Sequence, residues 1–152
     1  MNTQAYWHPM IVHFPLALIV TAAVALLLAR TMSGSIAATL AMVGTWNLCL
    51  GAVAALFAVG TGMAAVIDLH LAVAAKEAVS SHVKWALFTS VAVLLLAVWR
   101  GAGSAQHTRP SWLFLLVLFA ATAALIETGY RGGQNVYRFG IGVVERAGPS
   151  GS

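Results

Sequence analysis

Four long apolar stretches dominate the pattern of this chain. They run from Met10 to Ala29, roughly from Ala41 to Leu69, from Val83 to Trp99, and from Trp112 to Ile126. A helix needs about 17–25 mostly apolar residues to cross a hydrocarbon core of about 30 Å. Each stretch reaches that length once its flanking residues are counted. The pattern therefore predicts an all-α fold, an integral membrane four-helix bundle.

The polar residues between these stretches set the expected boundaries. We expect helices over about 9–30, 38–68, 82–100 and 111–129. They form one four-transmembrane-helix domain, residues 1–130, and a polar, Gly-rich C-terminal tail follows over residues 131–152. Residues 1–7 contain no Lys or Arg, so we expect a retained first helix, not a signal peptide. Four crossings place both termini on the same side of the membrane.

Composition and charge agree with a membrane protein. The 152 residues are 61% hydrophobic and 8% charged, whereas soluble domains carry about 25% charged residues. The formal net charge is +4, but the basic residues cluster at helix ends and in loops, where they anchor a chain in the lipid bilayer. We therefore expect no nucleic-acid partner. Asn47 lies inside the second apolar stretch and is expected to bond to another helix.

The ionisable residues divide unequally between the two sides of the membrane. One side receives His8, His13, Asp68, His70, His82, Glu127 and Arg131. The other side receives Arg30, Arg100, His107 and Arg109, all in loops or at helix ends. Ionisable groups within membrane helices are costly and usually face an interior or a cavity, so a functional site is expected on the first side.

His13 is the foremost candidate, because apolar residues flank it within the first helix. Pro15 follows it, and a proline near the start of a helix can bend it and help to aim a nearby side chain. His8 and His82 are further candidates at similar depth. The alternative for each is structural, since an interfacial histidine can bond lipid headgroups, water or a backbone carbonyl.

Two motifs resemble a known family. The segment 8–15, His-Pro-Met-Ile-Val-His-Phe-Pro, is similar to the HPxxVHFP opening of the bacterial membrane proteins called domain of unknown function family 2231. The Gly-Gly, Val-Tyr and Gly-x-Gly-Val of segment 132–143 resemble the closing motif of that family. Some members are fused to cytochrome c-like or Rieske domains, so the resemblance implies electron transfer in a bacterial inner membrane. Phe139 stands where related tails carry His.

The first functional hypothesis is one b-type haem, bound by histidines of two helices as in membrane cytochromes b. His13 and His82 are the preferred pair, and His8 is the substitute, because it lies about 140° around the helix from His13. Electrons would pass between quinol and a periplasmic carrier such as a cytochrome c. Three residues are candidates for an entrance on the same side, Arg131, Tyr130 and Trp85, and Glu127 is a further candidate for the site.

Two other hypotheses remain open, and no catalytic residue is assigned in any of them. Zinc or copper could be bound by His8, His13, His82 and Asp68, for hydrolysis or for metal handling. Such an ion needs three or four ligands within about 2.0–2.2 Å, whereas haem needs two ligands and a flat apolar slot. Alternatively, the chain is a structural anchor or accessory subunit of a larger respiratory complex.

Overall fold

The fold is entirely helical over the residues that the computed structural model describes, 4–66, 73–102 and 108–141, with side chains from Trp7 onward. The helices are α1 (Gln4–Ile11), α2 (His13–Thr31), α3 (Gly34–Val66), α4 (Val73–Gly101) and α5 (Trp112–Phe139). Four spans are long and apolar enough to cross a membrane, the first being α1 and α2 together, Trp7–Thr31. The predicted all-α, four-helix membrane fold is confirmed.

Proline interrupts the first span. Pro15 lacks the backbone N–H that would bond the carbonyl of Ile11, so the helical hydrogen-bond ladder is broken where α1 meets α2. The N–H of Val12 still bonds the carbonyl of His8 at 3.1 Å. The two helices therefore run on as one span with a local irregularity at Val12.

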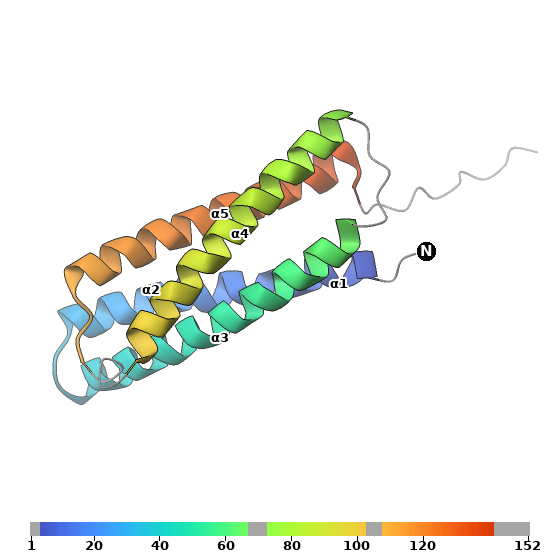
Figure 1. Cartoon of the computed structure of the whole chain (residues 1–152). Helices are drawn as coiled ribbons and strands as arrows, with labels where there is room; N and C mark the ends of the chain where they lie inside the picture. The colour runs from blue at the N-terminus through green and yellow to red at the C-terminus, as the bar shows by residue number, and fades with distance from the viewer. Residues whose placement is uncertain (1–3, 67–72, 103–107, 142–152) are drawn as a thin grey trace, which may run out of the picture.

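The helices form an elongated bundle with two different ends (Figure 1). At one end, called here the histidine end, α1 begins, α3 ends, α4 begins and α5 ends. At the other, called here the arginine end, α2 turns into α3 and α4 is connected to α5. The described chain thus begins and ends on one side. The α4–α5 pair diverges from α1 and α3 toward the histidine end.

The apolar core lies in the middle of the bundle and toward the arginine end. Its largest fully buried side chains are Ile19, Leu26, Leu48, Leu118 and Val93. Toward the histidine end most buried positions are small or polar, among them Ala58, Thr89, Thr128 and Asn135, and Val79 is a buried apolar side chain there. Large side chains such as Phe57, Leu95 and Leu116 are more than 60% exposed on the surface of the bundle, and in a membrane they face lipid.

Small residues bring α2 and α3 close together. A Cβ added at Gly44 would lie 2.6 Å from Cγ of Leu26, so the two backbones approach closely there. One turn away, Nδ2 of Asn47 donates to Oγ1 of Thr21 in α2 at 3.3 Å. The interhelical bond predicted for Asn47 is therefore present.

Two helix boundaries differ from the sequence-based expectation. α4 begins at Val73, not near residue 82, so its polar first turns extend beyond the apolar stretch. α5 continues through Gly132 and Gly133 to Phe139, and the expected boundary at residue 130 does not hold. Gly140 ends α5 with φ 64°, a left-handed conformation that glycine adopts without steric strain.

Candidate functional site

Two histidines from different helices have neighbouring rings at the histidine end. The ring centroids of His8, in α1, and His82, in α4, lie 6.3 Å apart, and the ring planes meet at 73°. Both side chains are half-buried. Since residues 8 and 82 lie on different spans, this pair joins the first span to the α4–α5 half of the bundle.

A backbone carbonyl fixes the orientation of each ring. Nδ1 of His8 lies 2.9 Å from the carbonyl oxygen of Ala58 in α3, and Nδ1 of His82 lies 3.1 Å from that of Thr128 in α5. A carbonyl can accept but cannot donate, so each Nδ1 carries the hydrogen. Each Nε2 then has a free lone pair, and neither has a hydrogen-bond partner in the described part of the chain.

A glycine lies against each ring. A Cβ added at Gly62 would be 2.8 Å from Cε1 of His8, and one added at Gly132 would be 3.0 Å from Cε1 of His82. A larger residue at either position would displace the imidazole or the helix. Both glycines thus make room for the rings, one on α3 and one on α5.

Threonine hydroxyls line the interior next to this pair. Oγ1 of Thr128 donates to the carbonyl of Ala124 at 2.8 Å and lies 3.1 Å from Oγ1 of Thr89. Thr89 in turn donates to the carbonyl of Trp85 at 2.7 Å. The hydroxyls are satisfied by these bonds, so the interior at the histidine end is polar without leaving an unpaired hydroxyl at these two positions.

His13, the foremost candidate from the sequence, lies elsewhere. Its side chain is exposed, and its Nδ1 is 2.7 Å from the carbonyl oxygen of Pro9, one turn back in the same span. The ring that contacts His82 is that of His8, the substitute in the sequence analysis. The angular offset of His8 and His13 about their helix explains why one faces inward and the other outward.

Two of the three entrance candidates, Arg131 and Trp85, form one cluster with Glu127 between α4 and α5. Nε of Arg131 pairs with Oε1 of Glu127 at 2.8 Å, and its Nη1 donates to Oγ of Ser81 at 2.9 Å. The guanidinium also lies 4.9 Å from the ring centre of Trp85. Tyr130, the third entrance candidate, is 63% exposed.

The zinc or copper hypothesis requires at least three ligands close to one ion. Among the described residues, no group of three or more His, Cys, Asp or Glu side chains is close enough to hold one ion. Asp68, the fourth ligand of that hypothesis, lies outside the described residues, as does His70. The described part of the chain thus brings two imidazoles together, His8 and His82, and not His13.

Sequence reasoning missed the groups that hold the two rings. These are the carbonyls of Ala58 and Thr128, the hydroxyl of Thr61, 3.3 Å from Nδ1 of His8, and the two glycines. The sequence could have pointed to Gly62 and Gly132, because each lies on another span at the same depth as a histidine. Backbone carbonyls gave none, since every residue has one.

The comparisons with known proteins identify a family. No curated protein and no solved structure matches this chain. The family described as "predicted membrane protein (DUF2231)" matches residues 6–145, which include both histidines, both glycines and all four spans. The resemblance noted from the two terminal motifs is confirmed, and the chain belongs to this family of predicted membrane proteins, DUF2231.

Proposed function

We propose that this chain is a membrane electron-transfer protein that binds one b-type haem between His8 and His82. The observation that carries the proposal is the pair of neighbouring imidazoles, each held through Nδ1 by a carbonyl and each with a free Nε2. Histidines that bind metals usually donate the other ring N–H to such an acceptor, which fixes the tautomer and the ring orientation.

The separation of the rings supports the same proposal. A metal binds an imidazole nitrogen at about 2.0–2.1 Å, and the ring centre lies roughly 1.1 Å further out, so two rings on opposite sides of one ion have centroids about 6.2–6.4 Å apart. The centroids of His8 and His82 are 6.3 Å apart. Their planes need not be parallel, because each ring can turn about its own bond to the metal.

The surroundings fit a flat ligand that enters from the histidine end. His8, Gly62, His82 and Gly132 are all half-buried, so the pair is not sealed by protein. In the described residues α1 packs on α2 and α3 without a close backbone approach to α4 or α5. No apolar core fills this end, whereas the apolar core holds the four spans together further along the bundle.

The chain would serve the haem in three ways. His8 and His82 would hold the iron, Gly62 and Gly132 would leave room for the imidazoles, and the two carbonyls would keep both Nε2 atoms unprotonated. A haem held by two imidazoles supplies a one-electron couple. Electrons would pass between quinol in the bilayer and a carrier such as a cytochrome c outside it, in a bacterial inner membrane.

The test is the visible spectrum of the protein purified in detergent, oxidised and then reduced with dithionite, with metal analysis of the same sample. We expect a reduced α-band that disappears in His8→Ala and in His82→Ala. His13→Ala is the matched control, because it removes an exposed imidazole from the same span and should keep the band.

Other outcomes would replace the proposal. Bound zinc or copper in place of haem, lost with the same two variants, would establish a metal site at His8 and His82. A band lost in His13→Ala but kept in His8→Ala would restore the pairing of His13 with His82. A protein without haem or metal, even after addition of hemin, would leave the two rings as helix-packing groups of an anchor subunit.

A further inference from the structure

Three arginines gather at the arginine end, far from the histidine pair. Arg30 ends α2, Arg100 ends α4, and Arg109 precedes α5. The four carboxylates of the chain are at positions 68, 77, 127 and 145, and none falls within residues 27–45 or 95–115, which make up this end. No carboxylate among the described residues of this end therefore balances the arginines.

Arg100 is the most buried of the three, with 4% of its surface exposed. Its Nε donates to Oγ1 of Thr45 at 3.2 Å, and its Nη2 donates to the carbonyl of Thr108. Both acceptors are neutral, so they satisfy hydrogen bonds without compensating the charge. A buried charge without a counter-charge is strongly destabilising, and an anion from outside the protein would remove that penalty.

Arg30 and Arg109 both lie near the α2–α3 turn. Arg30 stacks on Trp112, with its guanidinium carbon 5.1 Å from the ring centre, and its buried Nε has no hydrogen-bond partner in the described residues. Arg109 is exposed and donates through Nη2 to the carbonyl of Met32 at 2.8 Å. Donors therefore remain available at this end for an anionic ligand.

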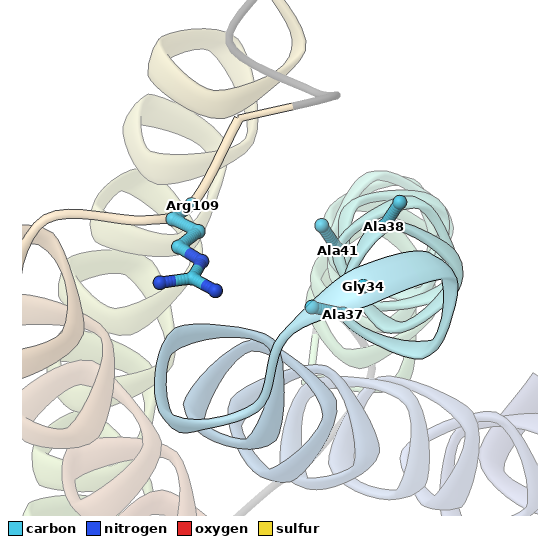
Figure 2. A pocket seen from close by; sticks show the side chains of 5 residues that line it. All are labelled: Gly34, Ala37, Ala38, Ala41 and Arg109. Atoms are coloured by element: carbon cyan, nitrogen blue, oxygen red, sulfur yellow. The ribbon is translucent and has the colours of Figure 1, made fainter.

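Two small cavities meet at Arg109. One of about 150 Å³ is lined by Arg109 and by the start of α3, namely Gly34, Ala37, Ala38 and Ala41. Figure 2 shows Arg109 across from this start of α3, with its guanidinium above the end of α2. The other, of about 200 Å³, is lined by Arg100 and Arg109 together with Trp99, Thr108, Pro110, Ser111 and Phe114. The first turn of a helix also offers free backbone N–H groups, which favour a bound anion.

We infer that the arginine end binds the phosphate of an anionic phospholipid. Exposed Trp99 and Trp112 mark the headgroup depth of the membrane at this end, so lipid phosphates lie level with the arginines. Each cavity has the volume of a few water molecules, at about 30 Å³ per water. This is enough for a phosphate but not for acyl chains. Acyl chains would lie outside, along exposed Ile36 and Leu113. This inference does not depend on the proposed haem.

The test is native mass spectrometry of the detergent-purified protein with phosphatidylglycerol and phosphatidylcholine that have identical acyl chains, added in equal amounts. We expect selective retention of phosphatidylglycerol. Arg109→Gln and Arg30→Gln should each weaken it by about fivefold. Arg138→Gln is the matched control, because it removes one exposed arginine from the histidine end and should leave the retention unchanged.

Three results would overturn the inference. The first is equal retention of the two lipids. The second is a loss of phosphatidylglycerol retention in Arg138→Gln as large as in Arg109→Gln and Arg30→Gln. Retention would then depend on the net charge of the protein and not on the arginine end. The third is full displacement of the lipid by millimolar inorganic phosphate, which would make free phosphate the ligand in place of a lipid. Arg100 is left unchanged in these variants, because its burial couples it to folding.

Discussion

His8 and His13 share a span but differ in what holds their rings. The acceptor for His8 lies on α3, fifty residues away in sequence, whereas the acceptor for His13 is four residues away on its own span. The orientation of His8 therefore depends on how the spans pack, and that of His13 does not. A ring whose direction is set by tertiary structure is suited to meet a ligand in a fixed geometry.

The two glycines beside the rings lead to a prediction at the same scale. Gly62→Ala and Gly132→Ala should each displace the neighbouring imidazole, because the added Cβ would lie 2.8 Å from Cε1 of His8 or 3.0 Å from Cε1 of His82. We expect each substitution to weaken haem binding by on the order of tenfold, as changes to groups that orient a metal ligand do. Titration of the apoprotein with hemin measures this, followed by the Soret absorbance.

Neighbouring glycines provide the controls. A Cβ added at Gly60 or at Gly133 would meet nothing within 4 Å, so Gly60→Ala and Gly133→Ala change the same helices without touching a ring. Both should bind hemin as the original chain does. If all four variants bound hemin equally, the close fit of glycine to imidazole would have no part in the site.

The sequence alone could place the candidate histidines at one end of the bundle but could not tell which of their rings lie next to each other. The unequal division of polar residues between the two sides correctly brought His8 and His82 to one end. The choice of His13 rested on its place within an apolar stretch, but depth does not determine which way a side chain points. That direction depends on the rotation of the first span against α3 and α4, which no single residue reveals.

At the scale of the helices, the α2–α3 contact depends on small residues in α3. At Gly44 the nearest atoms to an added Cβ include Cγ of Leu26 at 2.6 Å and its backbone N at 3.2 Å. At Gly51 the nearest atoms include Cδ1 of Ile19 at 2.5 Å, the far end of a flexible side chain, and Cβ of Leu18 at 3.2 Å. The first position has little freedom to adjust, whereas the second can respond by a rotamer change.

This difference ranks two substitutions. Gly44→Ala should lower the free energy of unfolding by about 1–3 kcal/mol, because overpacking forces α2 and α3 apart. Gly51→Ala should have a smaller effect, and Gly60→Ala in the same helix should have none or be slightly stabilising. Reversible unfolding in detergent, followed by circular dichroism, measures all three. A larger loss for Gly51→Ala than for Gly44→Ala would contradict this account of the interface.

The helix types were predictable, whereas two helix ends were not. The apolar stretches were long enough to predict four spans, but residues 73–81 lie outside the apolar stretch of their helix, and residues 131–139 are polar and Gly-rich, so hydropathy alone does not add either segment to a span. Tertiary contacts override this local preference. Asn135 is buried, and Gly132 packs on His82, so the last turns of α5 are held by the rest of the bundle.

At the scale of the whole molecule, the two ends have different kinds of interior. The apolar core joins all four spans between the middle and the arginine end. The histidine end has small and polar buried residues instead, and its ring contact between His8 and His82 crosses from one half of the bundle to the other. A ligand bound between these rings would therefore link two halves that the core does not hold together there.

If the proposed function holds, a single haem should stabilise the whole bundle. One pair of neighbouring imidazoles would bind one haem per chain, so His8→Ala and His82→Ala should each remove all of it and not half. Hemin at 100 times its dissociation constant should raise the free energy of unfolding by about 2.7 kcal/mol. Heme content per chain and thermal unfolding with and without hemin measure both effects. Because His13 lies outside the pair, hemin should raise the free energy of unfolding of His13→Ala by the same amount. Two haems per chain would require a second site. Half of the haem left in His8→Ala would require one as well.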